Sequence, residues 1–93
     1  MVTQPGVATR SIRSVIAAEL QRVAMEHGRI LAPVADEVRL LELGLDSLDL
    51  AVVVARLQDA LNVDPFSSGQ FLEAPVTFGD FVSMYERALR QVA

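Results

Sequence analysis

Residues 40–50 read Leu-Leu-Glu-Leu-Gly-Leu-Asp-Ser-Leu-Asp-Leu and mark the junction between a loop and a helix. Gly44 suits a turn, because glycine adopts backbone conformations that other residues avoid. Asp46 is a strong helix N-cap, and Asp49 three residues later gives a weaker form of the capping box. The stretch therefore predicts a helix whose first residue is Ser47.

The segment 45–64 contains no glycine or proline, and we expect one helix within it. Its valine-rich run over residues 50–55 would by itself also suit a buried strand, since β-branched residues disfavour helices. Length decides for a helix, because apolar residues continue at helical spacing at Leu57, Ala60 and Leu61.

An amphipathic helix is predicted upstream. Apolar residues recur there at three- and four-residue steps over residues 12–24, with charged residues such as Glu19 between them. Thr9 or Ser11 could cap its start, and Gly28 suits its C-terminal end. A long ordered loop is expected to follow. The large apolar residues expected to lie against the core in this part of the chain are Met25, Ile30, Leu31, Leu40, Leu41 and Leu43.

A last helix is predicted near the C-terminus, where residues 77–80 repeat the capping-box pattern and residues 78–92 supply an apolar face. Residues 70–73 are long enough for only one helical turn. Residues 1–8 contain a Pro-Gly pair and no periodicity, so we expect a flexible tail. The fold class expected is all-α, with three main helices and one short helix in a single domain over residues 9–93.

Composition excludes several classes of chemistry. The chain has 93 residues, no cysteine and one histidine, and all eight basic residues are arginine. Disulfides, thiolate metal sites, multi-histidine metal sites and Schiff-base chemistry on lysine are therefore excluded. The net charge of −4 argues against nucleic-acid binding, which requires a positive surface.

Hydropathy predicts neither a membrane span nor a signal peptide. The hydrophobic fraction is high at 52%, but much of it is alanine and valine. The longest apolar run covers residues 50–55, far short of the roughly 20 residues that cross a bilayer. Residues 1–10 lack the apolar core of a signal peptide. We expect a cytoplasmic protein.

Residues 43–48, Leu-Gly-Leu-Asp-Ser-Leu, resemble the prosthetic-group attachment site of acyl carrier proteins, and the resemblance extends over about residues 11–89. It implies a small four-helix bundle that carries 4′-phosphopantetheine on Ser47 as a phosphodiester, with Gly44 in the attachment turn. It also implies that a phosphopantetheinyl transferase delivers the group from coenzyme A. Asp46 would help to hold the divalent metal ion of that transfer, and the carrier itself has no resident metal.

The residue chemistry agrees with a modified serine rather than a catalytic one. Ser47 would project from a helix N-terminus, whose N–H groups and dipole favour phosphate, although Asp46 and Asp49 oppose it with negative charge. No base lies near Ser47 in sequence, and the Gly-x-Ser-x-Gly motif of hydrolases is absent. His27 is expected to be a polar residue at a helix end with no function. We therefore expect no catalytic residue.

The acidic residues are concentrated in one segment. Residues 42–64 hold Glu42, Asp46, Asp49, Asp59 and Asp64 against Arg56 alone. A charged stretch is ordinarily a solvated helix face, but it also suits docking to basic partners. The residues expected on the partner-docking surface are Leu48, Asp49, Val52, Ala55, Arg56 and Asp59.

The resemblance also bears on the type of carrier. Aspartate before the serine implies an acyl cargo, although an aminoacyl cargo stays open. Val52, Ala55 and Arg56 stand where carriers of fatty-acid synthases usually have glutamates, which implies a specialised, polyketide-like or other pathway. The chain begins with Met1 and ends near its last helix, so we expect a free-standing monomeric carrier. Its partners would be the transferase, an acyl-loading ligase or transferase, and downstream synthase enzymes.

Three other interpretations stay open from the sequence. One is an unmodified helical interaction module with the same fold, which would not need a serine at position 47. A small helix-turn-helix DNA-binding protein is disfavoured by the acidic charge. A hydrolase using Ser47 would require a nearby general base.

Overall fold

The computed structural model describes residues 11–65 and 75–92, and this part of the chain is mostly helical. It contains helices α2 (Ile12–Glu26), α3 (Ser47–Leu61) and α4 (Phe78–Val92), and a short 3₁₀ turn η1 (Leu40–Glu42). No strand occurs among these residues. The three main helices predicted from the sequence are confirmed. The expected short helix at 70–73 and the expected tail at 1–8 lie outside the described residues.

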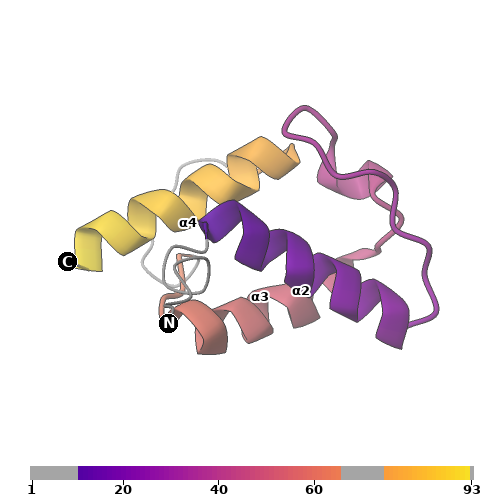
Figure 1. Ribbon diagram of the computed structural model, residues 1–93, viewed down its shortest axis with the longest axis horizontal. Helices are drawn as coiled ribbons and strands as arrows, with labels where there is room; N and C mark the ends of the chain where they lie inside the picture. The colour runs from indigo at the N-terminus through magenta and orange to yellow at the C-terminus, as the bar shows by residue number, and fades with distance from the viewer. Residues whose placement is uncertain (1–10, 66–74, 93) are drawn as a thin grey trace, which may run out of the picture.

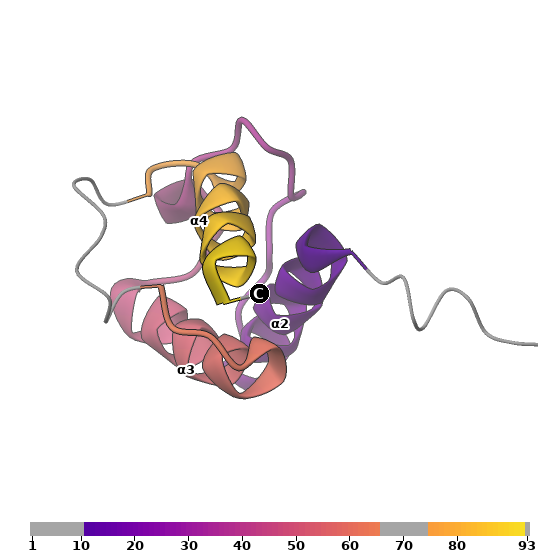
Figure 2. The same cartoon turned by 90° about the vertical axis from the view of Figure 1, so that its left-hand side faces the viewer.

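Helix α2 packs against both α3 and α4. In Figure 1, α2 runs from the centre towards the right, whereas α3 and α4 run from right to left. The C-terminal end of α2 therefore lies at the same end of the bundle as the N-terminal ends of α3 and α4. Figure 2 shows the three helices arranged around a common interior.

Side-chain caps explain where the helices begin. Ser11 caps α2, because its Oγ accepts a hydrogen bond from the backbone N–H of Ser14 at 3.1 Å. At α4, the N–H of Asp80 donates to Thr77 Oγ1 at 3.1 Å, and the N–H of Thr77 donates to Asp80 Oδ2 at 3.1 Å. This reciprocal pair confirms the second capping box predicted from the sequence.

The core is formed by one face of each helix. Phe81 and Tyr85 of α4 pack edge to face, with ring centroids 5.3 Å apart. Each large apolar side chain that is fully buried stabilises the fold by about 1.5–3 kcal/mol. The other buried members are Ile16, Leu20, Val23, Ala24, Leu40, Leu43, Leu45, Val53, Leu57, Phe78 and Val82.

The loop between α2 and α3 is held in place by backbone hydrogen bonds. The N–H of Leu40 donates to the carbonyl of Val76 at 2.9 Å, and the N–H of Phe78 donates to the carbonyl of Val38 at 2.8 Å. These bonds attach the loop to the start of α4. The long loop is therefore ordered, as the sequence predicts, and it contains the η1 turn.

Several expected core residues are instead exposed. Leu40 and Leu43 are buried and Leu31 packs against the core, but Leu41 is 79% exposed. In a 3₁₀ turn, residues three apart share a face, so burial of Leu40 and Leu43 turns Leu41 outwards. Ile30 is 91% exposed.

Two assignments of helix faces in α2 were also wrong. Met25 is 72% exposed rather than packed in the core, because the buried face of the last turn is already formed by Val23 and Ala24. Glu19 is buried instead of solvated, and its Oε2 accepts a hydrogen bond from Arg22 Nη1 at 3.1 Å. Hydrophobic spacing does not distinguish positions at the margin of a buried face.

Gly44 meets two separate constraints. Its φ is 100°, in the region that disfavours residues with a side chain. A Cβ placed on it would lie 2.6 Å from the backbone carbonyl oxygen of Ile30, which is too close. Gly28 also has a positive φ, 69°, but a Cβ there would meet nothing within 4 Å. Gly28 therefore meets only the backbone constraint, whereas Gly44 meets both.

Gly44→Ala is predicted to destabilise the protein more than Gly28→Ala. For a residue with a Cβ, the left-handed conformation of Gly28 costs about 1–2 kcal/mol, and the φ of 100° at Gly44 lies further outside the region that such residues adopt. The clash with Ile30 adds about 1–3 kcal/mol at position 44, the usual cost of overpacking. Urea titration gives the free energy of unfolding of each variant. Equal losses would contradict the steric role of Gly44.

Candidate functional site

Ser47, the residue predicted to carry the prosthetic group, is the first residue of α3, and it is exposed. Leu48 follows and is 70% exposed. The end of the bundle that presents Ser47 also carries the C-terminal end of α2 and the start of α4 (Figure 1). Both side chains are thus accessible to another protein at that end.

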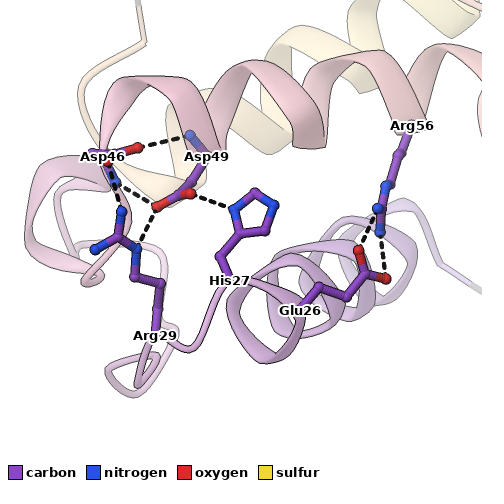
Figure 3. Close-up of polar contacts among 6 residues, drawn as sticks. All are labelled: Glu26, His27, Arg29, Asp46, Asp49 and Arg56. Atoms are coloured by element: carbon purple, nitrogen blue, oxygen red, sulfur yellow. Dashed lines mark hydrogen bonds and ion pairs between the residues drawn. The ribbon is translucent and has the colours of Figure 1, made fainter.

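The start of α3 is fixed by a complete capping box. The backbone N–H of Asp49 donates to Asp46 Oδ1 at 2.8 Å, and the N–H of Asp46 donates to Asp49 Oδ2 at 3.0 Å. Figure 3 shows both carboxylates at this turn. Aspartate at the third helical position is a weaker sequence signal than glutamate, yet it closes the box here. The predicted helix start is confirmed.

Asp49 is 2% exposed, so it does not lie on the outward docking face where the sequence placed it. The capping box turns its side chain back towards the end of α2. There, Asp49 Oδ1 lies 2.5 Å from His27 Nδ1. Asp49 therefore connects two helices instead of meeting a partner, and His27, for which no role was expected, is the residue it contacts.

Arg29 joins both aspartates (Figure 3). Its Nη2 donates to Asp46 Oδ2 at 2.7 Å, and its Nε donates to Asp49 Oδ2 at 3.0 Å. The carboxylates that flank Ser47 in sequence are thus each paired with a cation from the end of α2. Sequence reasoning missed Arg29, because it precedes Asp46 by 17 residues and no local spacing connects them.

These hydrogen bonds perturb the acidity of Asp49. The backbone N–H of Asp46 is the largest cause, followed by the hydrogen bond with His27, and together with Arg29 they lower the pKa of Asp49 to about 2. Hydrogen bonds and cations stabilise the charged form of a carboxyl group. Asp49 is therefore ionised throughout the neutral and mildly acidic range.

A second ion pair crosses between α2 and α3. Arg56 Nη1 donates to Glu26 Oε2 at 3.0 Å, and Arg56 Nη2 contacts Glu26 Oε1 (Figure 3). Arg56 lowers the pKa of Glu26 through this hydrogen bond, and Glu26 raises the pKa of Arg56. Arg56, expected on the docking surface, is thus engaged within the protein.

The other residues expected to dock partners differ in exposure. Ala55 and Asp59 are exposed, whereas Val52 is partly buried and packs against the core. Because Asp49 is buried and Arg56 is paired with Glu26, the exposed face of α3 carries fewer free charges than the sequence of this helix suggests.

In the part of the chain that the structure describes, no group of histidine and acidic residues could hold a metal ion. The same residues include no helix long and apolar enough to cross a membrane.

Asp49→Asn is predicted to destabilise the protein at neutral pH. It should also make the free energy of unfolding depend less on pH in the acidic range. The pKa of Asp49 is about 2 in the folded protein, below its ordinary value of 3.8. The unfolded chain therefore binds more protons in this range, so the stabilisation is complete above about pH 5 and is lost progressively as the pH falls towards about 1. Urea titrations at a series of pH values measure the free energy of unfolding of wild type and of Asp49→Asn.

The matched control is Asp59→Asn, which removes one exposed carboxylate from the same helix. It changes the net charge equally without breaking the contact between α2 and α3. The difference in free energy of unfolding between wild type and Asp49→Asn should narrow as the pH falls from about 5 to about 2. A difference that stays constant over this range would contradict the role assigned to the Asp49 carboxylate.

Comparison with known proteins identifies the family. The family model described as "Phosphopantetheine attachment site" matches residues 10–83, which is most of the chain and includes α2, α3 and the capping box between them. No curated protein and no solved structure matches the chain in these comparisons. The domain is the site of covalent 4′-phosphopantetheine attachment, and the chain belongs to the phosphopantetheine-attachment family of acyl carrier proteins.

Proposed function

We propose that Ser47 carries the 4′-phosphopantetheine arm and that the protein presents acyl or aminoacyl thioesters to partner enzymes. One observation carries this proposal: Ser47 is an exposed serine at the first position of a firmly capped helix within the matched family segment. The resemblance of residues 43–48 to the attachment motif supports the same residue. The arm supplies the terminal thiol that holds the cargo, so the chain needs no cysteine.

The residues around Ser47 fit a phosphodiester. Among the described residues, the N–H groups of Ser47 and Leu48 have no hydrogen-bond acceptor in the protein, as is usual in the first turn of a helix. They lie at the positive end of the helix dipole, which favours an anion. Gly44 permits the tight turn that precedes this site. These features support attachment at Ser47.

Asp46 is proposed to contact the divalent metal ion during transfer of the arm, as the family resemblance implies. Its Oδ1 accepts the capping hydrogen bond and its Oδ2 accepts from Arg29. Its side chain is 54% exposed and therefore accessible to the transferase. A metal ion would compete with Arg29 for Oδ2.

We propose that the chain is a carrier and not an enzyme, since carrier domains of this family are generally non-catalytic. Its partners would be a phosphopantetheinyl transferase, an acyl-loading ligase or transferase, and downstream synthase enzymes. The departure of Val52, Ala55 and Arg56 from the acidic pattern of fatty-acid carriers supports a specialised pathway. The cytoplasmic location and the monomeric, free-standing state expected from the sequence stay predictions.

The proposed docking surface consists of Leu48, Val52, Ala55 and Asp59 on α3, with Arg56 at its margin. Leu48 supports this placement best. Its large apolar side chain is 70% exposed beside Ser47, and covering it with a partner would make the free energy of binding more favourable. Asp49 is withdrawn from this surface because it is buried.

Ser47→Ala is predicted to abolish loading while leaving the fold intact. The side chain is exposed, so its loss removes the attachment oxygen without opening a cavity. The intact mass is measured before and after incubation with coenzyme A, magnesium and a broad-specificity phosphopantetheinyl transferase. Wild type should gain one phosphopantetheine and Ser47→Ala none.

Ser83→Ala is the matched control, because Ser83 is an exposed serine on α4. This variant should load like wild type, and circular dichroism should show equal helicity in all three proteins. A mass gain in Ser47→Ala would place the arm on another residue. No gain in well-folded wild type with several transferases would favour the unmodified interaction module.

Leu48→Ala is predicted to weaken recognition by partner enzymes without destabilising the carrier. If a partner buries this side chain, its loss costs about 1–2 kcal/mol of binding, or a five- to thirty-fold rise in KM. Steady-state kinetics of the transferase with the unmodified carrier measure this. Asp59→Asn tests the acidic contribution in parallel. An unchanged KM for Leu48→Ala would remove Leu48 from the docking surface.

A further inference from the structure

An arm on Ser47 brings a negative charge to a turn that already holds two carboxylates. The phosphodiester adds one anionic group directly between Asp46 and Asp49 in the sequence. The N–H groups at the start of α3 attract it, but a helix terminus offers only about half an elementary charge. Unless a cation balances the aspartates, the arm would be repelled by the turn that carries it.

Among the described residues, Arg29 is the cation that contacts both aspartates of this turn. It contacts Asp46 on one side and Asp49 on the other. His27 contacts only Asp49, which is buried, and no hydrogen bond connects it with Asp46. The side chain of Arg29 is 42% exposed, whereas that of His27 is 31% exposed. Arg29 therefore stands on the solvent side of the ion-pair network, next to the residue that precedes Ser47.

Arg29 also has N–H donors for which the described residues provide no acceptor. A guanidinium group has five N–H donors, and the bonds to the two aspartates use one at Nε and one at Nη2. Figure 3 shows the remaining nitrogen pointing away from both carboxylates, with no contact drawn to it. Guanidinium groups suit phosphate oxygens because their planar N–H pairs match the spacing of those oxygens.

We propose that Arg29 is the positioning residue for the phosphodiester. It neutralises Asp46 and Asp49 in the unmodified protein, and it donates hydrogen bonds from its free N–H groups to the phosphate once the arm is attached. This inference rests on the proposed attachment at Ser47. Arg29 thereby fixes the direction in which the arm leaves the bundle.

The test compares the unmodified and loaded wild-type proteins by nuclear magnetic resonance. The guanidinium ¹⁵N and ¹H resonances of Arg29 should shift on loading. Those of Arg13 should stay in place, because Arg13 pairs with Asp36 on another part of the surface through a similar two-point contact. Unshifted Arg29 resonances in fully loaded protein would overturn the proposal. This measurement needs no variant and is independent of effects on folding.

Variants then test the phosphate itself through its ³¹P resonance. In loaded Arg29→Gln, the ³¹P shift should move towards that of free phosphopantetheine diester, whereas Arg29→Lys should restore part of the wild-type shift because its charge remains. Arg13→Gln should keep the wild-type value. A ³¹P shift equal in wild type and Arg29→Gln would overturn the proposal.

Intact mass separates this inference from the function on which it rests. Wild type that gains no phosphopantetheine would overturn both. Wild type that gains it on Ser47 but shows no change at Arg29 would overturn the positioning role alone and leave the carrier function standing.

Discussion

The turn that precedes Ser47 depends on the hydrogen bonds that the buried carboxylate of Asp49 accepts. One side chain closes the N-terminal cap of α3 and also binds His27 and Arg29 at the end of α2. A buried carboxylate is tolerated only when its oxygens are satisfied by donors. Because all three donors come from fixed backbone or from the adjoining helix end, the start of α3 is held in one place relative to α2.

This constraint suits the proposed role of Ser47 as a residue that other enzymes reach. Ser47 and Leu48 are exposed immediately beside the turn that the capping box holds. Gly44 lets the preceding chain pass against the backbone of Ile30, which brings the loop up to the helix without covering the serine. An exposed acceptor on a rigid support costs a partner little ordering entropy on binding.

Folding buries or pairs several of the charges that the sequence places near Ser47. Residues 42–64, whose net charge of −4 equals that of the whole chain, have one aspartate buried and another paired with Arg29, and their only arginine is paired with Glu26. Paired charges contribute less to the field that steers a partner than free ones. The recognition proposed at the Ser47 end would therefore rely on exposed apolar surface as well as on charge.

The sequence by itself determined the helices and the attachment motif. Caps at Ser11, Asp46 and Thr77 and the 3.6-residue spacing of apolar residues are local signals, since they act within one turn or one helix face. Only the tertiary structure decided that Asp49 turns inwards and that Arg29, 17 residues upstream of Asp46, meets it. Contacts between helix ends depend on how the loop between the helices folds back. Side chains that pair over such a separation in the chain produce no periodic pattern in the sequence.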